Sequence, residues 1–225
     1  ALPFDLLLVA TGRKPNVEGF GLEALGVRLR ANGTIETDDR LRTNIPNILA
    51  AGDVTGPFQL THAGAHQAWY AAVNALFGRF RTFRADYRVL PAAVYTDPEL
   101  ARVGLNEREA AAQGLEVEVV THAFAELDRA IAEGETRGFV KVLVPPGKDR
   151  ILGAIVVGAR AGELIALFAL AMKHGIGLDG ILRTVFAYPT FAEIAKSVAG
   201  TRRRRHAPQR LLGWLARYHA FERRG

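Results

Sequence analysis

The pattern of apolar and polar positions changes character along the chain. Residues 4–10 form an apolar run, broken only by Asp5, of the kind that is buried on both faces in a parallel sheet. A second short apolar run spans residues 48–51 and stops at Gly52. A parallel strand needs neighbours, and the sequence offers no βαβ partner for residues 4–10. The pattern therefore predicts a fragment of a larger α/β domain.

The segment between and after these runs is rich in turn residues, then becomes helical. Residues 14–44 contain many Gly, Pro and Asn residues, and Asn32-Gly33 predicts a hairpin. Residues 62–77 predict a helix with small residues on several faces, which indicates close packing against another element. The basic, turn-like residues 79–88 then predict a linker.

After this linker the pattern mixes strands and helices without strict βαβ alternation. The predicted strands span residues 89–95, 116–123, 139–144 and 151–157, the last two forming a hairpin. The predicted helices span residues 106–113, between Asn106 as cap and Gly114 as stop, residues 161–173, a short segment capped by Asp179, and about residues 208–222. This mixture favours an α+β domain with an antiparallel sheet.

Composition excludes several classes of protein. The 225 residues are 49% hydrophobic and 23% charged, as in folded globular proteins, and the apolar runs are too short for a membrane span or a signal peptide. We therefore expect a cytoplasmic protein.

The absence of cysteine excludes a disulfide framework, a thiol nucleophile and cysteine metal ligands within these residues, and no metal site is predicted. The net charge of +6 resides largely in Arg202–Arg205 and the residues that follow, so nucleic-acid binding is not expected of the main body.

Four stretches carry a recognisable order of residues. They are Ala-Thr-Gly-Arg-Lys-Pro-Asn at 10–16, Arg-Thr-Asn-Ile-Pro-Asn-Ile-Leu-Ala-Ala-Gly-Asp-Val at 42–54, Val-Tyr-Thr-Asp-Pro-Glu-Leu-Ala-Arg-Val-Gly-Leu at 94–105, and Ile-Leu-Gly-Ala leading to Ala-Gly-Glu-Leu-Ile at 151–165. In this order the chain resembles the class I pyridine nucleotide–disulfide oxidoreductases over about residues 4–200. That family includes dihydrolipoamide dehydrogenase, glutathione reductase and mercuric reductase.

The resemblance implies a fold and a domain order. An α/β nucleotide-binding remnant is expected first, followed by an α+β dimerisation domain whose antiparallel sheet is flanked by helices. The implied divisions are the end of an NAD-binding domain at 1–15, the C-terminal portion of an FAD-binding domain at 16–80, the dimerisation domain at 87–200, and a basic amphipathic tail at 201–225.

The second stretch contains the strongest candidate for cofactor contact. A buried strand ends at Gly52, where a backbone without Cβ permits close approach of a ligand, and Asp53 adds a carboxylate that accepts hydrogen bonds. Taken alone, Asp53 could simply cap a turn. The resemblance implies that Asp53 binds the ribityl chain of FAD.

Two neighbouring segments complete the predicted cofactor site. The helix that follows begins around Leu60, Thr61, His62 and Ala63, and its N–H groups and dipole favour negative charge. The resemblance implies that this helix start, through its backbone, faces the pyrimidine end of the reduced flavin. Thr11 and Gly12 end the first apolar run and either contact the cofactor or only form a turn between domains.

The predicted catalytic stretch departs from the family pattern. The family has a His-Pro-Thr sequence followed by a glutamate, whereas this chain has Tyr188-Pro189-Thr190 and Glu193. Tyrosine ionises near pH 10, against about 6.5 for histidine, so it can donate a hydrogen bond near neutral pH but is a poor base. Mercuric reductases carry tyrosine here, yet they also use a C-terminal cysteine pair. Tyr188 could instead pack in a dimer interface, and a cis bond before Pro189 is a further hypothesis.

The resemblance implies a homodimeric, FAD-dependent oxidoreductase as the parent protein. It would take a hydride from NAD(P)H and act on a small-molecule or disulfide substrate, while the isolated chain would be inactive. The alternative is a standalone dimerisation or interaction module without catalysis. The tail helix, with Leu211, Trp214 and Tyr218 on one stripe, could pack on its own protein, on a partner's groove or on an anionic membrane, and packing on its own protein is favoured.

Overall fold

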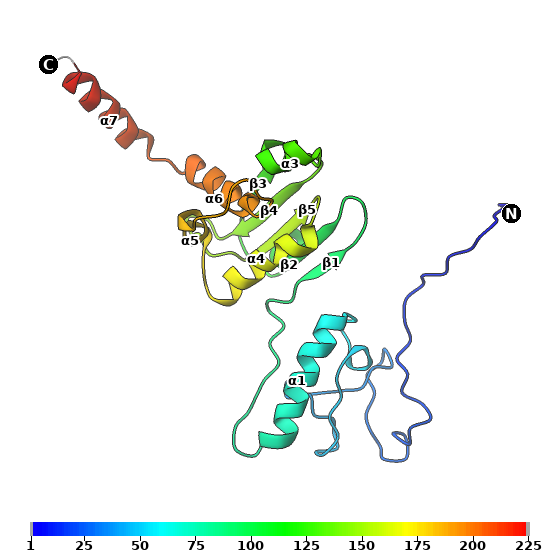
Figure 1. The fold of residues 1–225 in the computed structure, drawn as a ribbon. Helices are drawn as coiled ribbons and strands as arrows, with labels where there is room; N and C mark the ends of the chain where they lie inside the picture. The colour runs from blue at the N-terminus through cyan, green and yellow to red at the C-terminus, as the bar shows by residue number, and fades with distance from the viewer. Residues whose placement is uncertain (1, 224–225) are drawn as a thin grey trace. The chain divides into compact units, whose positions relative to one another are not determined.

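The computed structural model describes residues 2–223, which divide into two compact units, Ala1–Tyr87 and Arg88–Gly225 (Figure 1). Ala1, in the predicted nucleotide-binding end, and residues 224–225, in the predicted tail, lie outside the described residues.

The second unit is built on one antiparallel sheet, as the sequence predicts, with five strands where the sequence predicts four. Its strands, in spatial order, are β1 (Ala92–Val94), β2 (Leu100–Gly104), β5 (Gly153–Val157), β4 (Phe139–Val144) and β3 (Glu118–Ala123). The register aligns a row of small and β-branched residues across the sheet. Val103 pairs with Ala154, Ala154 with Val142, and Val142 with Val120. All four are buried, so this row marks the face of the sheet that forms the core.

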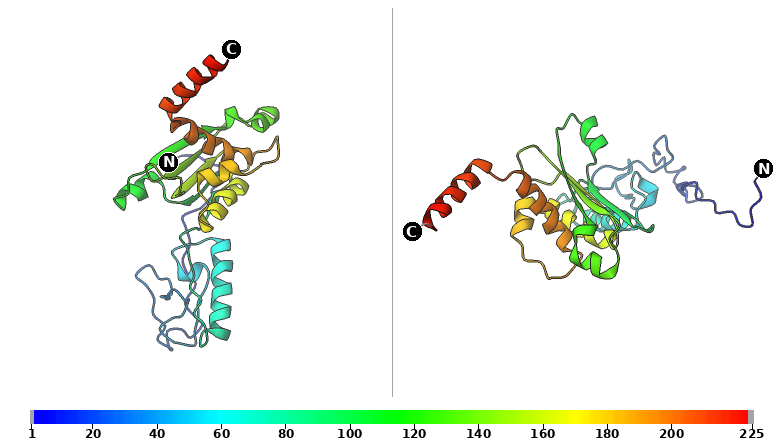
Figure 2. Two further views of the ribbon diagram at one scale, coloured as in Figure 1. Left: turned by 90° about the vertical axis from the view of Figure 1, so that its left-hand side faces the viewer. Right: turned by 90° about the horizontal axis from the view of Figure 1, so that it is seen from above.

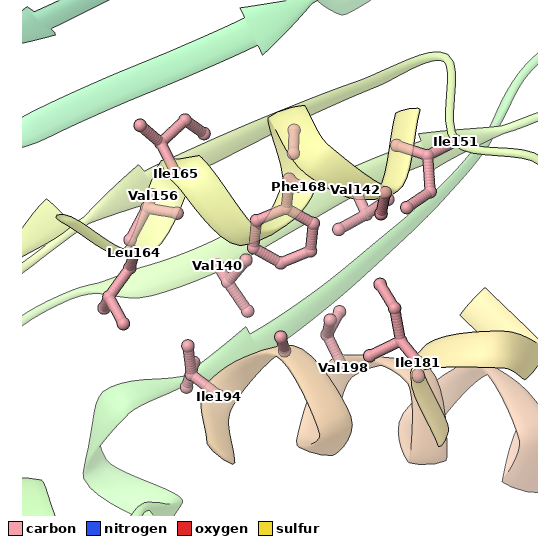
Figure 3. Close-up of a cluster of buried hydrophobic side chains, with 14 of the residues drawn as sticks. Val140, Val142, Ile151, Val156, Leu164, Ile165, Phe168, Ile181, Ile194 and Val198 are labelled. Carbon is pink, nitrogen blue, oxygen red and sulfur yellow. The ribbon is translucent and has the colours of Figure 1, made fainter. Parts of the chain in front are cut away.

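Helices cover that face (Figure 2). The helices of this unit are α2 (Glu107–Ala112), α3 (Asp128–Glu133), α4 (Ala161–Lys173), α5 (Leu178–Arg183), α6 (Glu193–Arg205) and α7 (Gln209–Glu222), with a 3₁₀ turn η2 (Phe124–Glu126) before α3. Helix α4 packs on β1, β2 and β5, while α6 packs on β3 and β4. The side chains of both helices meet those of the strands in a single apolar cluster (Figure 3).

Phe168 lies at the centre of this cluster. Its ring is fully buried between α4, the strand residues Val140 and Val156, and α6 residues such as Ile194 (Figure 3). The apolar residues of α4 recur at helical spacing, which is why the sequence predicts both the helix and its buried face. The core of the second unit therefore forms entirely from its own elements.

The first unit has one long helix, α1 (Thr61–Phe77), and a 3₁₀ turn, η1 (Asp53–Thr55). Its small core contains Val17, Val27 and Ile35. The predicted hairpin at Asn32-Gly33 is a tight turn flanked by one isolated bridge, Leu29 to Ile35. The strand predicted at 48–51 is likewise reduced to one bridge, Arg42 to Leu49.

The prediction of a buried strand at residues 4–10 is wrong. These residues form no secondary structure, and Leu6 and Leu8 are 90% and 87% exposed. A strand forms only when its N–H and C=O groups pair with a neighbour, and none of the described residues pairs with this segment. An apolar sequence alone therefore does not make a strand.

Three further differences concern the second unit. Strand β2, helix α3 and helix α6 are not among the predicted elements, and β2 lies inside the third motif. Asp179 does not cap α5, because the N-cap residue is Gly177 and Asp179 lies in the first turn of the helix. Its carboxylate lies 3.8 Å from the guanidinium of Arg202 instead.

The arginine run is part of α6 rather than a solvated tail. Arg202 is buried, and its guanidinium donates to the carbonyl of Lys148 at 2.8 Å. Arg205 donates to the carbonyl of Val119 at 3.0 Å, which joins the end of α6 to β3. The expectation of solvated arginines is therefore wrong for Arg202, because the turn between β4 and β5 supplies an acceptor that the local sequence does not reveal.

The predicted tail helix is present as α7, but none of its residues is buried. The expectation that it packs on its own protein is therefore wrong for residues 209–222. None of the helices within residues 2–223 combines the length and the apolar character needed to cross a bilayer.

We expect Phe168→Ala to lower the free energy of unfolding by about 3–5 kcal/mol, because it leaves a cavity under both helices. The matched control is Leu170→Ala on the same helix, where the side chain is exposed, and its effect should stay within about 0.5 kcal/mol. Urea unfolding followed by far-ultraviolet circular dichroism measures both, and equal losses would contradict the assignment of the core.

Candidate functional site

The loop at Gly52 has a conformation that glycine adopts readily. Gly52 has φ +86°, and a Cβ built on it meets no atom within 4 Å, so the backbone lies open on that side. Gln67 holds the loop from behind. Its buried side-chain oxygen accepts from the Gly52 N–H at 2.6 Å and from the Thr55 hydroxyl at 3.2 Å. The loop is therefore fixed by Gln67 on one side, while the Gly52 backbone is accessible on the side where a Cβ would point.

The start of α1 lies against this loop because the helix presents a small residue there. A Cβ added to Gly64 would come within 3.2 Å of the Gly52 Cα. The helix begins at Thr61 with Leu60 as N-cap, without a side-chain cap bond and without an acidic residue in its first turn. An uncapped helix start of this kind favours a negatively charged group.

Asp53 lies in the wall of an open hollow of about 510 Å³. Its lining residues are Arg13, Lys14, Pro15, Asn16, Asp53, Val54 and Gln59. Asp53 Oδ2 accepts a hydrogen bond from the Arg13 guanidinium at 2.6 Å. Both side chains are exposed, so the pair contributes at most about 1 kcal/mol to stability. A polar ligand could therefore replace Arg13 at small cost.

Of the predicted cofactor residues, Asp53 lines this hollow and the others do not. Thr11 and Gly12 are exposed, and the neighbouring Arg13 connects their segment to Asp53. Thr61 and His62 are exposed at the helix start, Leu60 is half-buried, and Ala63 is fully buried. Within residues 2–223, no group of three potential metal-ligating side chains occurs.

The predicted catalytic residues lie in the second unit, at the turn that leads into α6. The Tyr188 hydroxyl donates to Asp128 Oδ2 at 3.0 Å, and the side chain is 70% exposed. Glu193 accepts from the backbone N–H of Thr190 at 3.1 Å, so it orders the turn. The Tyr188–Pro189 peptide bond is cis, as hypothesised from the sequence.

The neighbouring carboxylates determine the protonation state of Tyr188. The hydrogen bond to Asp128 raises the pKa of the Tyr188 phenol above its ordinary value, and the charges of Asp128 and Glu193 act in the same direction. Tyr188 therefore stays neutral around pH 7. Chemically, this arrangement can donate a hydrogen bond but does not generate a phenolate base.

Three residues of these sites were not singled out from the sequence. Arg13 lies inside the first motif, so its charge next to a predicted ligand site was an available signal. Gln67 and Asp128 gave no such signal. Gln67 lies 15 residues along the chain from Gly52, its hydrogen-bond partner, and Asp128 lies 60 residues from Tyr188.

Comparison with known families matches both units. Residues 1–73 match the family described as pyridine nucleotide-disulphide oxidoreductase, and residues 90–199 match the dimerisation domain of the same family.

Individual relatives agree with these matches. The chain is 39% identical over 191 residues to dihydrolipoyl dehydrogenase of Chlamydia muridarum, covering 85% of this chain and 40% of that protein. It is 40% identical over 197 residues to mercuric reductase of Acidithiobacillus ferrooxidans, covering 88% of this chain and 36% of that protein. The chain therefore spans about two fifths of the length of these relatives.

Solved structures are similar as well. The HOCl-induced flavoprotein disulfide reductase RclA from Escherichia coli matches with a TM-score of 0.76 at 30% identity, covering 85% of this chain and 44% of that one. LpdA from Mycobacterium tuberculosis matches with a TM-score of 0.76 at 29% identity, covering 83% of this chain and 40% of that one.

We expect Asp128→Asn to lower the pKa of Tyr188 toward the ordinary value of a tyrosine, because the charged acceptor that favours the neutral phenol is lost. Tyr218 is a matched control, since its hydroxyl donates to Glu222 at 2.8 Å and its pKa is also raised. Glu222→Gln should lower the pKa of Tyr218 alone. NMR titration of ring-labelled tyrosine, assigned with Tyr→Phe variants, measures both pKa values. An unchanged Tyr188 pKa in Asp128→Asn would contradict the hydrogen bond between Tyr188 and Asp128.

Proposed function

The chain belongs to the pyridine nucleotide-disulphide oxidoreductase family, and we propose that it supplies part of the FAD site and the homodimer interface of an FAD-dependent NAD(P)H oxidoreductase. The observation that carries this proposal is the arrangement in the first unit. A fixed glycine loop, an exposed carboxylate and an uncapped helix start all occur within one short stretch of chain.

The chemistry of these groups fits the middle of an FAD molecule. Gly52 leaves its backbone open to close approach, and the Asp53 carboxylate can accept hydrogen bonds from ribityl hydroxyls. When bound, FAD would supply hydride acceptance from a nicotinamide and electron transfer to the substrate. Gln67 contributes indirectly, because it holds the Gly52 N–H and so keeps the loop in its open conformation.

The start of α1 would act on the electronic properties of the flavin. Its first turn carries partial positive charge from the helix dipole, and no acidic side chain in that turn cancels it. Negative charge on a reduced flavin would be favoured at this position. The role belongs to the backbone around Thr61 and His62 rather than to the imidazole of His62.

Arg13 would regulate access to Asp53. In the structure it pairs with the carboxylate that the flavin would use. Because this pair is exposed, a ribityl hydroxyl can replace it without stranding a buried charge. Arg13 would then be free to turn toward another polar group of the ligand.

Tyr188 would face the substrate with a neutral phenol, whose one O–H donates to Asp128 in the structure and would donate to the substrate only by turning away from Asp128. Asp128 fixes the hydroxyl, and Glu193 fixes the turn that carries it. The chain has no cysteine, so a thiol or disulfide that took part would come from outside these residues. A neutral donor at this position suits stabilisation of an anionic or metal-bound group better than proton abstraction.

The structure also favours a second candidate function, a dimerisation module without catalysis. The second unit has a complete core and a paired sheet, whereas residues 4–10 of the first unit are exposed and unpaired. The chain alone would then dimerise without holding FAD.

We expect the purified chain to bind FAD only weakly, because it would supply only part of the site, and Asp53→Ala to weaken that binding by about tenfold or more, since a charged acceptor contributes about 1.5–3 kcal/mol to a hydrogen bond. Flavin fluorescence titration measures the dissociation constant. Asp5→Ala removes the same charge from an exposed position in the same unit and should leave binding unchanged. Near-stoichiometric flavin absorbance in the purified chain would reject the module, and equal loss in both variants would refute the role of Asp53.

We further expect sedimentation equilibrium to give twice the chain mass of 24.5 kDa, because residues 90–199 match a dimerisation domain. A monomer at all concentrations would contradict both candidate functions. A dimer that binds no FAD would support the module alone.

A further inference from the structure

Helix α7 lies beyond the part of the chain that the family accounts for. The matched dimerisation domain ends at residue 199, whereas α7 spans Gln209–Glu222. Pro208 stands at its N-cap position and separates it from α6. A role for α7 must therefore come from its own residues.

One side of α7 carries a row of apolar and aromatic residues, which ends at Glu222, the acceptor of the Tyr218 hydroxyl. We call this side the aromatic stripe, and its residues are Leu211, Trp214, Leu215, Tyr218 and Phe221. Their spacing of three and four residues places them on one face. Trp214 and Tyr218 stack at a centroid distance of 5.8 Å, yet Trp214 is 60% exposed and Phe221 79%. An apolar stripe of this size that is exposed to water is typical of a surface that binds another molecule.

The charge of the chain is concentrated in the same segment. Residues 201–225 contain eight arginines and one glutamate, so of the net charge of +6 this segment carries +7 and the remaining residues carry −1. Arg210 and Arg217 on α7, and Arg223 at its C-cap, lie outside the aromatic stripe. The segment therefore combines an apolar stripe with arginines beside it.

This combination selects among the surfaces that could cover the aromatic stripe. A second copy of α7 would bring two strongly positive segments together, and the rest of the chain has too little net negative charge to compensate. A nucleic acid would attract the arginines but leave Trp214 and Phe221 in water. An anionic lipid surface satisfies both features, because its acyl boundary accepts apolar side chains and its phosphates accept arginine.

We propose that α7 is an interfacial helix that binds the chain to an anionic lipid surface. The helix lies in the plane of the surface, with the aromatic stripe at the boundary between head groups and acyl chains. Trp214 and Tyr218 suit this boundary because each combines an apolar ring with a polar N–H or O–H. The arginines contact lipid phosphates, so the attachment depends on both apolar contact and charge.

Vesicle flotation of the full chain tests the proposal. We expect the chain to float with vesicles that contain about 30% phosphatidylglycerol and not with phosphatidylcholine alone. Trp214→Ala/Phe221→Ala and Arg210→Gln/Arg217→Gln should each reduce the bound fraction by about tenfold or more. High salt should release the chain partly, because it screens the charges but not the apolar contact.

Matched controls separate this effect from general charge and from misfolding. Arg79→Gln/Arg108→Gln removes the same two charges from exposed positions outside α7 and should leave flotation unchanged. Circular dichroism checks that each variant retains its fold. The proposal fails if the chain ignores anionic vesicles, floats equally with neutral ones, or loses binding equally in the control. It also fails if the α7 variants change oligomeric mass or nucleic-acid binding instead of flotation.

Discussion

Backbone pairing is the constraint on which the structure depends. Every strand needs a neighbour for its N–H and C=O groups, and the two units differ in whether the described residues supply one. In the second unit β4 pairs with both β3 and β5, and the row from Val103 to Val120 crosses the sheet without a gap. In the first unit residues 4–10 have a suitable sequence but no partner. The paired sheet supports α4 and α6, and α6 begins at the turn that carries Tyr188.

Local pattern predicted those elements whose cause is local. The β4–β5 hairpin, the capped α2 and the amphipathic α4 follow from alternation, a capping box and helical spacing. Helix α6 was missed because its four arginines in succession suggested a solvated tail. Only the contact with the β4–β5 turn, distant in sequence, explains why the Arg202 guanidinium is held there. Elements fixed by such long-range contacts could not be read from the sequence.

The candidate sites divide in the same way. The glycine at position 52, the carboxylate beside it and the following helix were predictable, because they are contiguous and their residue types are distinctive. The residues that hold these groups in place could not be predicted. Gln67 and Asp128 are ordinary polar residues, and only the fold shows that one holds the loop and the other the tyrosine hydroxyl. Motifs thus indicated the candidate groups, while the structure indicates what positions them.

The exposure of the candidate groups bears on how they could work. Asp53 and Tyr188 both make their hydrogen bonds at the surface, where water competes and each bond contributes little. The same bonds strengthen when a ligand or a second subunit excludes water, because the local dielectric constant falls. A flavin over the Gly52 loop would do this for the hydrogen bonds that Asp53 would accept from the ligand in place of Arg13. A dimer partner would do it for the one hydrogen bond that the Tyr188 O–H makes, whether to Asp128 or to a substrate. The proposed homodimer is therefore a condition for Tyr188 to act as a strong donor, rather than only a means of holding two chains together.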